Sequence, residues 1–104
     1  MPQYKEQEGT GSKTRVRDEE PDMYDVVMLN DDFTTMDFVV EVLRTVFFHN
    51  RPAAERIMLA IHKKGQSVVG TYILDIAESK QHKAMQMAQA EGFPLRVKVQ
   101  PHKG

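Results

Sequence analysis

The chain has 104 residues, a length typical of one domain, and its 14 Lys and Arg residues nearly balance its 15 Asp and Glu residues. The formal net charge of -1 argues against nucleic-acid binding, which needs a concentrated positive patch. The lack of Cys excludes disulfides, Cys-bound zinc and thiolate nucleophiles. No apolar run approaches the ~20 residues that cross a bilayer, and we see no secretory or transit signal. We therefore expect a cytoplasmic protein that does not bind membranes.

Composition divides the chain into two segments. Residues 1–22 contain three apolar side chains and ten charged ones, four positive and six negative. Such a segment cannot bury enough apolar surface to offset the entropy of ordering, so we expect a disordered N-terminal extension. Residues 23–104 hold the other 39 of the 42 apolar residues, which is enough for one modest core.

The folded segment begins with a predicted strand over residues 24–29, which ends at the polar run Asn30-Asp31-Asp32. A helix to about His49 follows, with apolar residues repeating on one face. Thr34 is its expected N-cap, with Asp37 as a weak capping box and Phe33 and Phe38 placed as a hydrophobic staple.

A second helix is predicted between two capping residues. Asn50 begins it, with Pro52 in its first turn, and Gly65 ends it as a left-handed C-cap. A strand over residues 68–73 comes next.

The rest of the chain predicts one more helix and one more strand. Asp75 and Glu78 form a capping box that opens the helix, Gly92 ends it, and residues 94–99 alternate as an edge strand. The order β-α-α-β-α-β predicts an α+β sandwich of three helices on a three-stranded antiparallel sheet.

Polar groups that can act together occur after the first strand and near the end of the second helix. Asn30 and Asp32 share one side if strand periodicity persists there, and His62 adjoins the apolar stripe of its helix, four residues after Met58. If the two helices pack over the end of the strand, these groups ring an apolar hole. Amide, carboxylate and neutral imidazole acceptors suit the ammonium of a free peptide N-terminus, and the hole suits a bulky side chain.

Four separated blocks of the sequence resemble the ClpS family of Clp protease adaptors. They are YDVVMLNDDFTTMDFVV (24–40), MLAIHKKG (58–65), DIAESK (75–80) and FPLRV (93–97). The resemblance implies a ClpS-like fold, shared with the C-terminal domain of the ribosomal stalk protein. It also implies an adaptor without a cofactor, not an enzyme, that delivers N-end-rule substrates beginning with Leu, Phe, Tyr or Trp to the ClpAP protease.

The resemblance also implies residue roles. Asn30, Asp32 and His62 would hold the substrate's α-amino group, and Asp31 and Thr34 would meet its backbone. The side-chain pocket would be lined by Met28, Met36, Val39, Met58, Ile61 and Leu95. A second face, with Asp75, Glu78 and Lys80, would dock the N-terminal domain of ClpA, and the extension would engage the unfoldase during delivery. We expect the adaptor to be a monomer.

Two other interpretations stay open at this stage. A small metal-dependent hydrolase would use Asp31, Asp32 and His62 as ligands, although no general base or oxyanion stabiliser accompanies them. A stalk-like interaction domain would not distinguish free from acetylated peptide N-termini. Each residue also has a simpler role, since Asn-Asp-Asp is a common turn and methionines fill gaps in cores.

Overall fold

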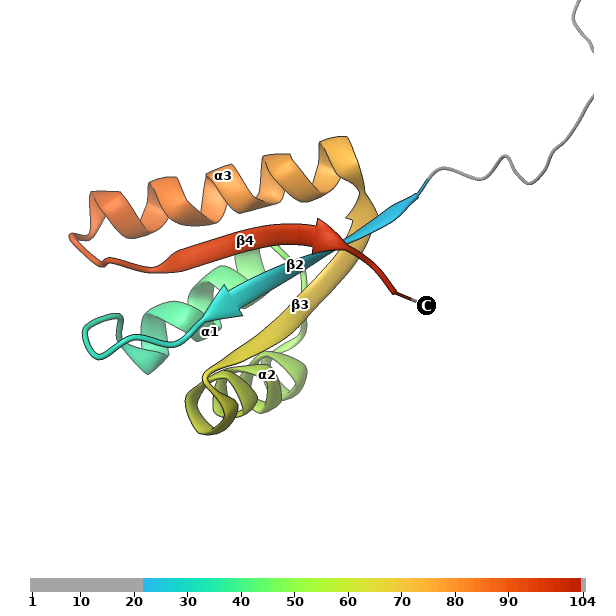
Figure 1. The fold of residues 1–104 in the computed structure, drawn as a ribbon. Helices are drawn as coiled ribbons and strands as arrows, with labels where there is room; N and C mark the ends of the chain where they lie inside the picture. Colours follow the sequence, from blue (N-terminus) through green and yellow to red (C-terminus); the bar gives the residue numbers. More distant parts are fainter. Residues whose placement is uncertain (1–21, 104) are drawn as a thin grey trace, which may run out of the picture.

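The computed structural model describes residues 22–103, so the predicted N-terminal extension lies almost entirely outside the described residues. Six elements follow in chain order: β2 (Met23–Leu29), α1 (Met36–Thr45), α2 (Arg51–Lys64), β3 (Gln66–Ile73), α3 (Leu74–Ala90) and β4 (Arg96–Pro101). The strands form one antiparallel sheet in the order β3-β2-β4, and the helices pack around it (Figure 1). This confirms the predicted α+β sandwich, with the last strand at an edge.

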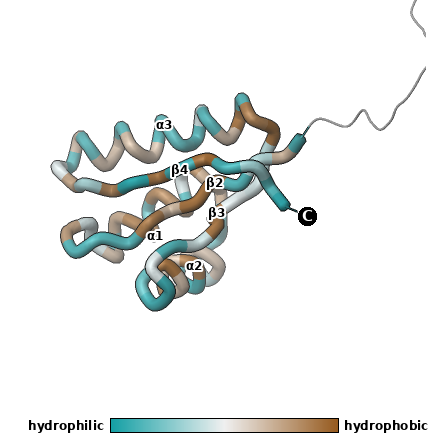
Figure 2. The backbone as a smooth tube through the Cα atoms, viewed as in Figure 1, coloured by the Kyte–Doolittle hydropathy of each residue, from teal (hydrophilic) through white to brown (hydrophobic). Residues whose placement is uncertain are grey.

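The core lies between the sheet and the helices. Val26 and Met28 of the central strand β2 are fully buried and share one hydrophobic cluster with Val42 and Leu43 of α1. Small residues let α3 pack closely on the sheet, because Ala77, Ala84 and Ala88 are all buried. Figure 2 shows that the turn after α2 is hydrophilic, whereas the start of α3 is hydrophobic.

The start of α1 differs from the prediction by one residue. The N-cap is Thr35, whose hydroxyl accepts a hydrogen bond of 3.1 Å from the backbone N–H of Phe38, and the helix begins at Met36. The prediction of Thr34 as the cap was wrong because its hydroxyl donates instead to the carboxylate of Asp31. Asp37 lies in the first turn, where its charge is favourable toward the helix dipole.

The end of α1 and the start of α3 also correct the sequence prediction. The first helix ends at Thr45, not near His49, because Phe48 takes a left-handed conformation with a φ of 59°. The third helix begins at Leu74 with Ile73 at its N-cap and no side-chain cap, so the predicted capping box at Asp75 is wrong. The chain passes directly from β3 into α3, which places Asp75 inside the first turn.

The second helix is capped as predicted. The Asn50 side chain accepts a hydrogen bond of 2.9 Å from the N–H of Ala53 at its start, and Gly65 ends it with a φ of 89°. This left-handed glycine determines where the chain leaves α2 for β3.

Candidate functional site

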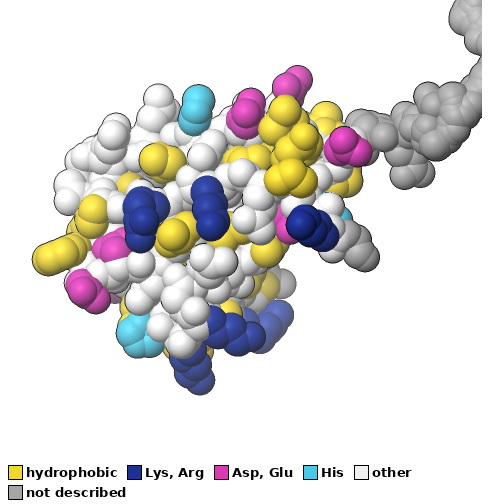
Figure 3. Space-filling view, in the orientation of Figure 1, with side chains coloured by type: hydrophobic (Ala, Val, Ile, Leu, Met, Phe, Trp, Pro, Cys, Tyr) yellow, Lys and Arg dark blue, Asp and Glu magenta, His cyan; other side chains and the backbone are white. Residues whose placement is uncertain are grey.

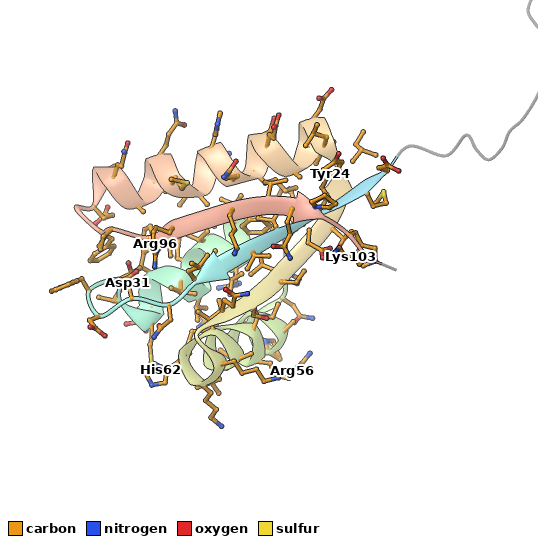
Figure 4. The ribbon with its side chains drawn as sticks, in the orientation of Figure 1. Tyr24, Asp31, Arg56, His62, Arg96 and Lys103 are labelled. Atoms are coloured by element: carbon orange, nitrogen blue, oxygen red, sulfur yellow. The ribbon has the colours of Figure 1, made fainter. Side chains whose placement is uncertain are left out.

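A cavity of about 220 Å³ opens where the loop after β2 meets the start of α1 and the end of α2. Nine residues line it: Asn30, Asp31, Asp32, Thr34, Met36, Val39, Met58, Ile61 and His62. Figure 4 shows Asp31 in the loop and His62 on α2 on the side of the molecule where β2 and α2 end. The structure therefore brings together nine of the residues that the sequence predicts for one site.

One backbone hydrogen bond joins the two polar parts of the site. The N–H of Asn30, just after β2, donates to the carbonyl of Gly65 over 2.9 Å. Gly65 is the left-handed C-cap of α2 and follows His62 by three residues. Because this bond ties the end of the strand to the end of the helix, it places the amide of Asn30 and the imidazole of His62 at the same cavity.

The carboxylate of Asp31 organises the loop. Its Oδ1 accepts hydrogen bonds from the backbone N–H groups of Phe33 (2.8 Å) and Thr34 (2.7 Å), and its Oδ2 accepts one from the Thr34 hydroxyl (2.7 Å). Burial raises the pKa of Asp31, but these hydrogen bonds and the positive charge of Arg96 outweigh that effect and lower the pKa below 3.8. Asp31 is therefore held as a carboxylate near neutral pH.

The rest of the cavity divides into polar and apolar parts. Asp32 and His62 are exposed, and Asn30 is half-buried, so their acceptor atoms reach solvent at the opening. Val39 and Ile61 are buried in the wall, and Met58 is half-buried. Met36, the first residue of α1, also lines the cavity and leaves 45% of its surface exposed.

Two predicted pocket residues do not line the cavity. Met28 is fully buried in the central strand, and Leu95, just before β4, is 5% exposed within the same core cluster. The three residues predicted to dock a partner lie on α3, outside the cavity. Asp75 and Glu78 are exposed, whereas Lys80 is half-buried against the segment that joins α1 to α2.

The sequence analysis missed a polar cluster on the sheet. Asp25 of β2 is buried and accepts hydrogen bonds from the Thr71 hydroxyl (2.7 Å) and from Nδ1 of His102 (2.8 Å). The available signal was a charged residue inside a strand of apolar residues. These contacts fasten the chain after β4 to the centre of the sheet.

Within residues 22–103, no group of three His, Asp or Glu side chains is arranged to hold a metal ion. Of the three ligands that a hydrolase would use, Asp31 accepts three hydrogen bonds within its own loop. No helix among the described residues has the length and apolar character needed to span a membrane.

Comparison with known proteins defines the class, which is an adaptor of an ATP-dependent protease. Residues 19–98 match the family model described as "ATP-dependent Clp protease adaptor protein ClpS". An ATP-dependent Clp protease adapter protein ClpS of Acetivibrio thermocellus is 51% identical over 89 residues, covering 86% of this chain and 90% of that protein. One of Campylobacter jejuni is 49% identical over 81 residues, covering 78% and 84%. The chain belongs to the ClpS family.

A solved structure supports the same assignment. The ClpS2 protein of Agrobacterium tumefaciens, determined bound to L-phenylalaninamide, superposes with a TM-score of 0.78 at 37% sequence identity. The match covers 80% of this chain and all of that chain. The fold and the family are therefore those that the four sequence blocks predict.

Proposed function

We propose that this adaptor binds proteins with a free, bulky hydrophobic N-terminal residue (Leu, Phe, Tyr or Trp) and delivers them to the ClpAP protease. The observation that carries the proposal is the composition of the 220 Å³ cavity, which has hydrogen-bond acceptors at its opening and apolar side chains in its wall. A free N-terminal residue has the complementary chemistry, with a cationic amine on one side of Cα and an apolar side chain on the other.

The amine would be held by Asn30, Asp32 and His62. An α-amino group has a pKa of about 7.7–8.0, so near neutral pH it is mainly an ammonium with three N–H donors. The amide oxygen, the carboxylate and a neutral imidazole nitrogen provide three acceptors, and the carboxylate adds an opposite charge. The proposal is supported by the fact that all three side chains line the same cavity.

The substrate side chain would enter the apolar part of the cavity, against Val39, Met58 and Ile61. Full burial of a Leu or Phe side chain contributes about 1.5–3 kcal/mol. The ligand of the Agrobacterium ClpS2 structure, L-phenylalaninamide, has a free α-amino group, a bulky side chain and an amide in place of the next peptide bond. That ligand therefore has the chemistry of the substrate class we propose.

The substrate backbone would meet Asp31 and Thr34. The Thr34 hydroxyl donates its proton to Asp31 over 2.7 Å, so it offers a ligand only lone pairs and acts as an acceptor for a peptide N–H. This hydrogen bond gives Asp31 a role in orienting Thr34.

Delivery would use a different part of the molecule. Asp75 and Glu78 are exposed and Lys80 is half-buried on α3, so they leave the cavity free while they dock the N-terminal domain of ClpA. The residues before β2 would engage the unfoldase during transfer. We propose that the adaptor acts as a monomer in the cytoplasm.

Fluorescence anisotropy with labelled peptides tests the binding proposal. Peptides that begin with Leu or Phe should bind, and N-acetylation should remove most of the affinity, because it eliminates the charge and leaves the acceptors unpaired. His62→Ala should weaken binding, whereas Lys63→Ala, one residue further along the same helix and also exposed, should not. Equal affinity for free and acetylated peptides would refute the assignment of the cavity.

A further inference from the structure

The segment that joins α1 to α2 is held firmly on both sides of one exposed aromatic residue. Val46 and Phe47 are 2% and 5% exposed, so both are part of the core. On the other side, the His49 ring donates from Nε2 to the Val69 carbonyl over 2.7 Å, and Asn50 caps α2. Between these anchored residues, Phe48 leaves 77% of its surface exposed.

The conformation of Phe48 is costly for an aromatic residue. Its φ of 59° lies in the left-handed region, where Gly and Asn are much better tolerated. Exposure of the phenyl ring adds an unfavourable contact with water. Neither cost is offset by burial in the free protein, since the side chain lies outside the hydrophobic core. A residue whose backbone conformation and exposed side chain both lower the stability of the free protein is a candidate for contact with a partner.

Lys80 of α3 holds this aromatic residue in place. Its Nζ donates to the carbonyl of Val46, the C-cap of α1, over 2.7 Å and lies 4.5 Å from the centre of the Phe48 ring. The rings of Tyr72 and Phe47 are 5.3 Å and 5.9 Å away. The ammonium is thus engaged by a helix C-terminus and by aromatic faces, two environments that favour a cation. These contacts give Lys80, which is only half-buried, a structural role in addition to its place on the proposed docking face.

Phe48 continues the surface that we propose as the docking face. Lys80 is one helical turn from Ile76, which is 44% exposed, and residues at this spacing share a helix face. Ile73 and Leu74 are 43% and 38% exposed, and the acidic Asp75 alternates with these apolar residues. Figure 3 shows hydrophobic and acidic side chains gathered over the start of α3.

We propose that Phe48 contacts the N-terminal domain of the ClpA unfoldase, and that Lys80 is a positioning residue that acts on this interface by holding Phe48. The inference rests on the proposed function, in which the α3 face docks the unfoldase. The complementary surface on the partner is apolar where it receives Phe48 and Ile76, and cationic where it meets Asp75 and Glu78.

Titration of fluorescently labelled adaptor with ClpA hexamers, in the presence of a non-hydrolysable ATP analogue, tests this proposal. Phe48→Asn should weaken ClpA binding at least tenfold. Its melting temperature should stay the same or rise, because Asn adopts a positive φ more readily than Phe. Binding of a Leu-initiated peptide should not change. Phe33→Asn is the matched control, since Phe33 is also highly exposed (73%) but lies in the loop after β2, and it should leave ClpA binding intact.

A double-mutant cycle separates positioning from direct contact. Lys80→Ala should weaken ClpA binding in the parent protein but add little in the Phe48→Asn background. Full additivity would show that Lys80 acts through its own charge and would overturn the positioning role. A drop in both melting temperature and peptide affinity for Phe48→Asn would show a structural residue and overturn the contact role.

Two acidic variants distinguish failure of this inference from failure of the proposed function. If Asp75→Ala and Glu78→Ala weaken ClpA binding and Phe48→Asn does not, the docking face stands and the role of Phe48 is refuted. If none of the three substitutions weakens binding, the docking face on α3 is itself wrong, and this inference is refuted with it.

Discussion

Met36 is expected to determine specificity by exclusion, and the substitution Met36→Ala tests this role. Met36 is the first residue of α1, lines the cavity and is 45% exposed, and we expect its side chain to lean back toward the preceding turn, over the mouth of the cavity. Because only about half of a methionine is buried there, truncation should cost about 1 kcal/mol of stability, half of the ~2 kcal/mol for a fully buried side chain. The variant should therefore remain folded.

The effect on specificity follows from the shape of the ligand at Cβ. Leu, Phe, Tyr and Trp branch at Cγ or beyond, so a slim Cβ passes the thioether, whereas Val and Ile carry two heavy substituents on Cβ. Forcing them past Met36 requires a distorted rotamer, at about 0.5–1.5 kcal/mol for a ~30° deviation. Removal of the obstruction should raise affinity for Ile and Val relative to Leu by roughly two- to twelvefold, which is that energy converted at about 1.4 kcal/mol per tenfold change.

Competition anisotropy with peptides that differ only in the first residue measures this change, with thermal melting as a check on folding. Leu59→Ala is a suitable control, because Leu59 lies on α2, is 43% exposed and does not line the cavity. If Met36→Ala melts cooperatively and still rejects Ile and Val as strongly as the parent protein, the gating role is refuted.

Two further predictions concern pH and the N-terminus. Because the pKa of Asp31 is lowered, its carboxylate stabilises the fold above pH 3.8, and this contribution is lost as the pH falls through the lowered value. The free energy of unfolding of Asp31→Asn should therefore decrease less on acidification than that of the parent protein. Deletion of residues 1–22 should leave melting and peptide affinity unchanged and abolish ClpAP degradation of a Leu-initiated reporter; normal degradation would refute the role of the extension.

Helix boundaries show where local sequence signals stop being sufficient. Thr34 and Thr35 are equally good N-caps by residue type, and the choice depends on a loop contact, since Asp31 takes the hydroxyl of Thr34. Apolar periodicity predicts that α1 continues toward His49, but the left-handed Phe48 ends it. No local rule favours that conformation for Phe, and the contact that holds it comes from Lys80, 32 residues further along the chain.

The candidate site was predicted more completely than the helix ends. All nine residues that line the cavity were singled out in the sequence, most of them because acceptor side chains after a strand and an apolar stripe on a helix are local patterns. Thr34 was assigned to the site only through the resemblance to the ClpS family. Sequence alone does not show how these patterns meet, which depends on the long-range bond from Asn30 to Gly65. It also does not show that Met28 lies in the core and outside the cavity lining, since that depends on which face of β2 the helices cover.

The bond between Asn30 and Gly65 gives the last prediction, which separates the geometry of the site from the stability of the fold. Gly65 and Gly92 both have positive φ angles, 89° and 77°, and a Cβ added to either meets no atom within 4 Å. Alanine at each position should therefore destabilise the protein by a similar amount, about 1–2 kcal/mol, from backbone strain alone. Gly92 follows α3 and does not line the cavity, whereas the carbonyl of Gly65 holds Asn30.

Relief of the strain at Gly65 requires rotation of its peptide group, which moves the carbonyl that accepts from Asn30 and shifts the end of α2 that carries His62. Gly65→Ala should weaken binding of a Leu-initiated peptide about three- to tenfold, or roughly 0.7–1.4 kcal/mol. Gly92→Ala should lose as much melting temperature as Gly65→Ala but should bind that peptide with the affinity of the parent protein. Equal peptide affinity in the two variants would show that the amine-binding groups do not depend on the Asn30–Gly65 bond, because the strain would then have been absorbed without moving either acceptor.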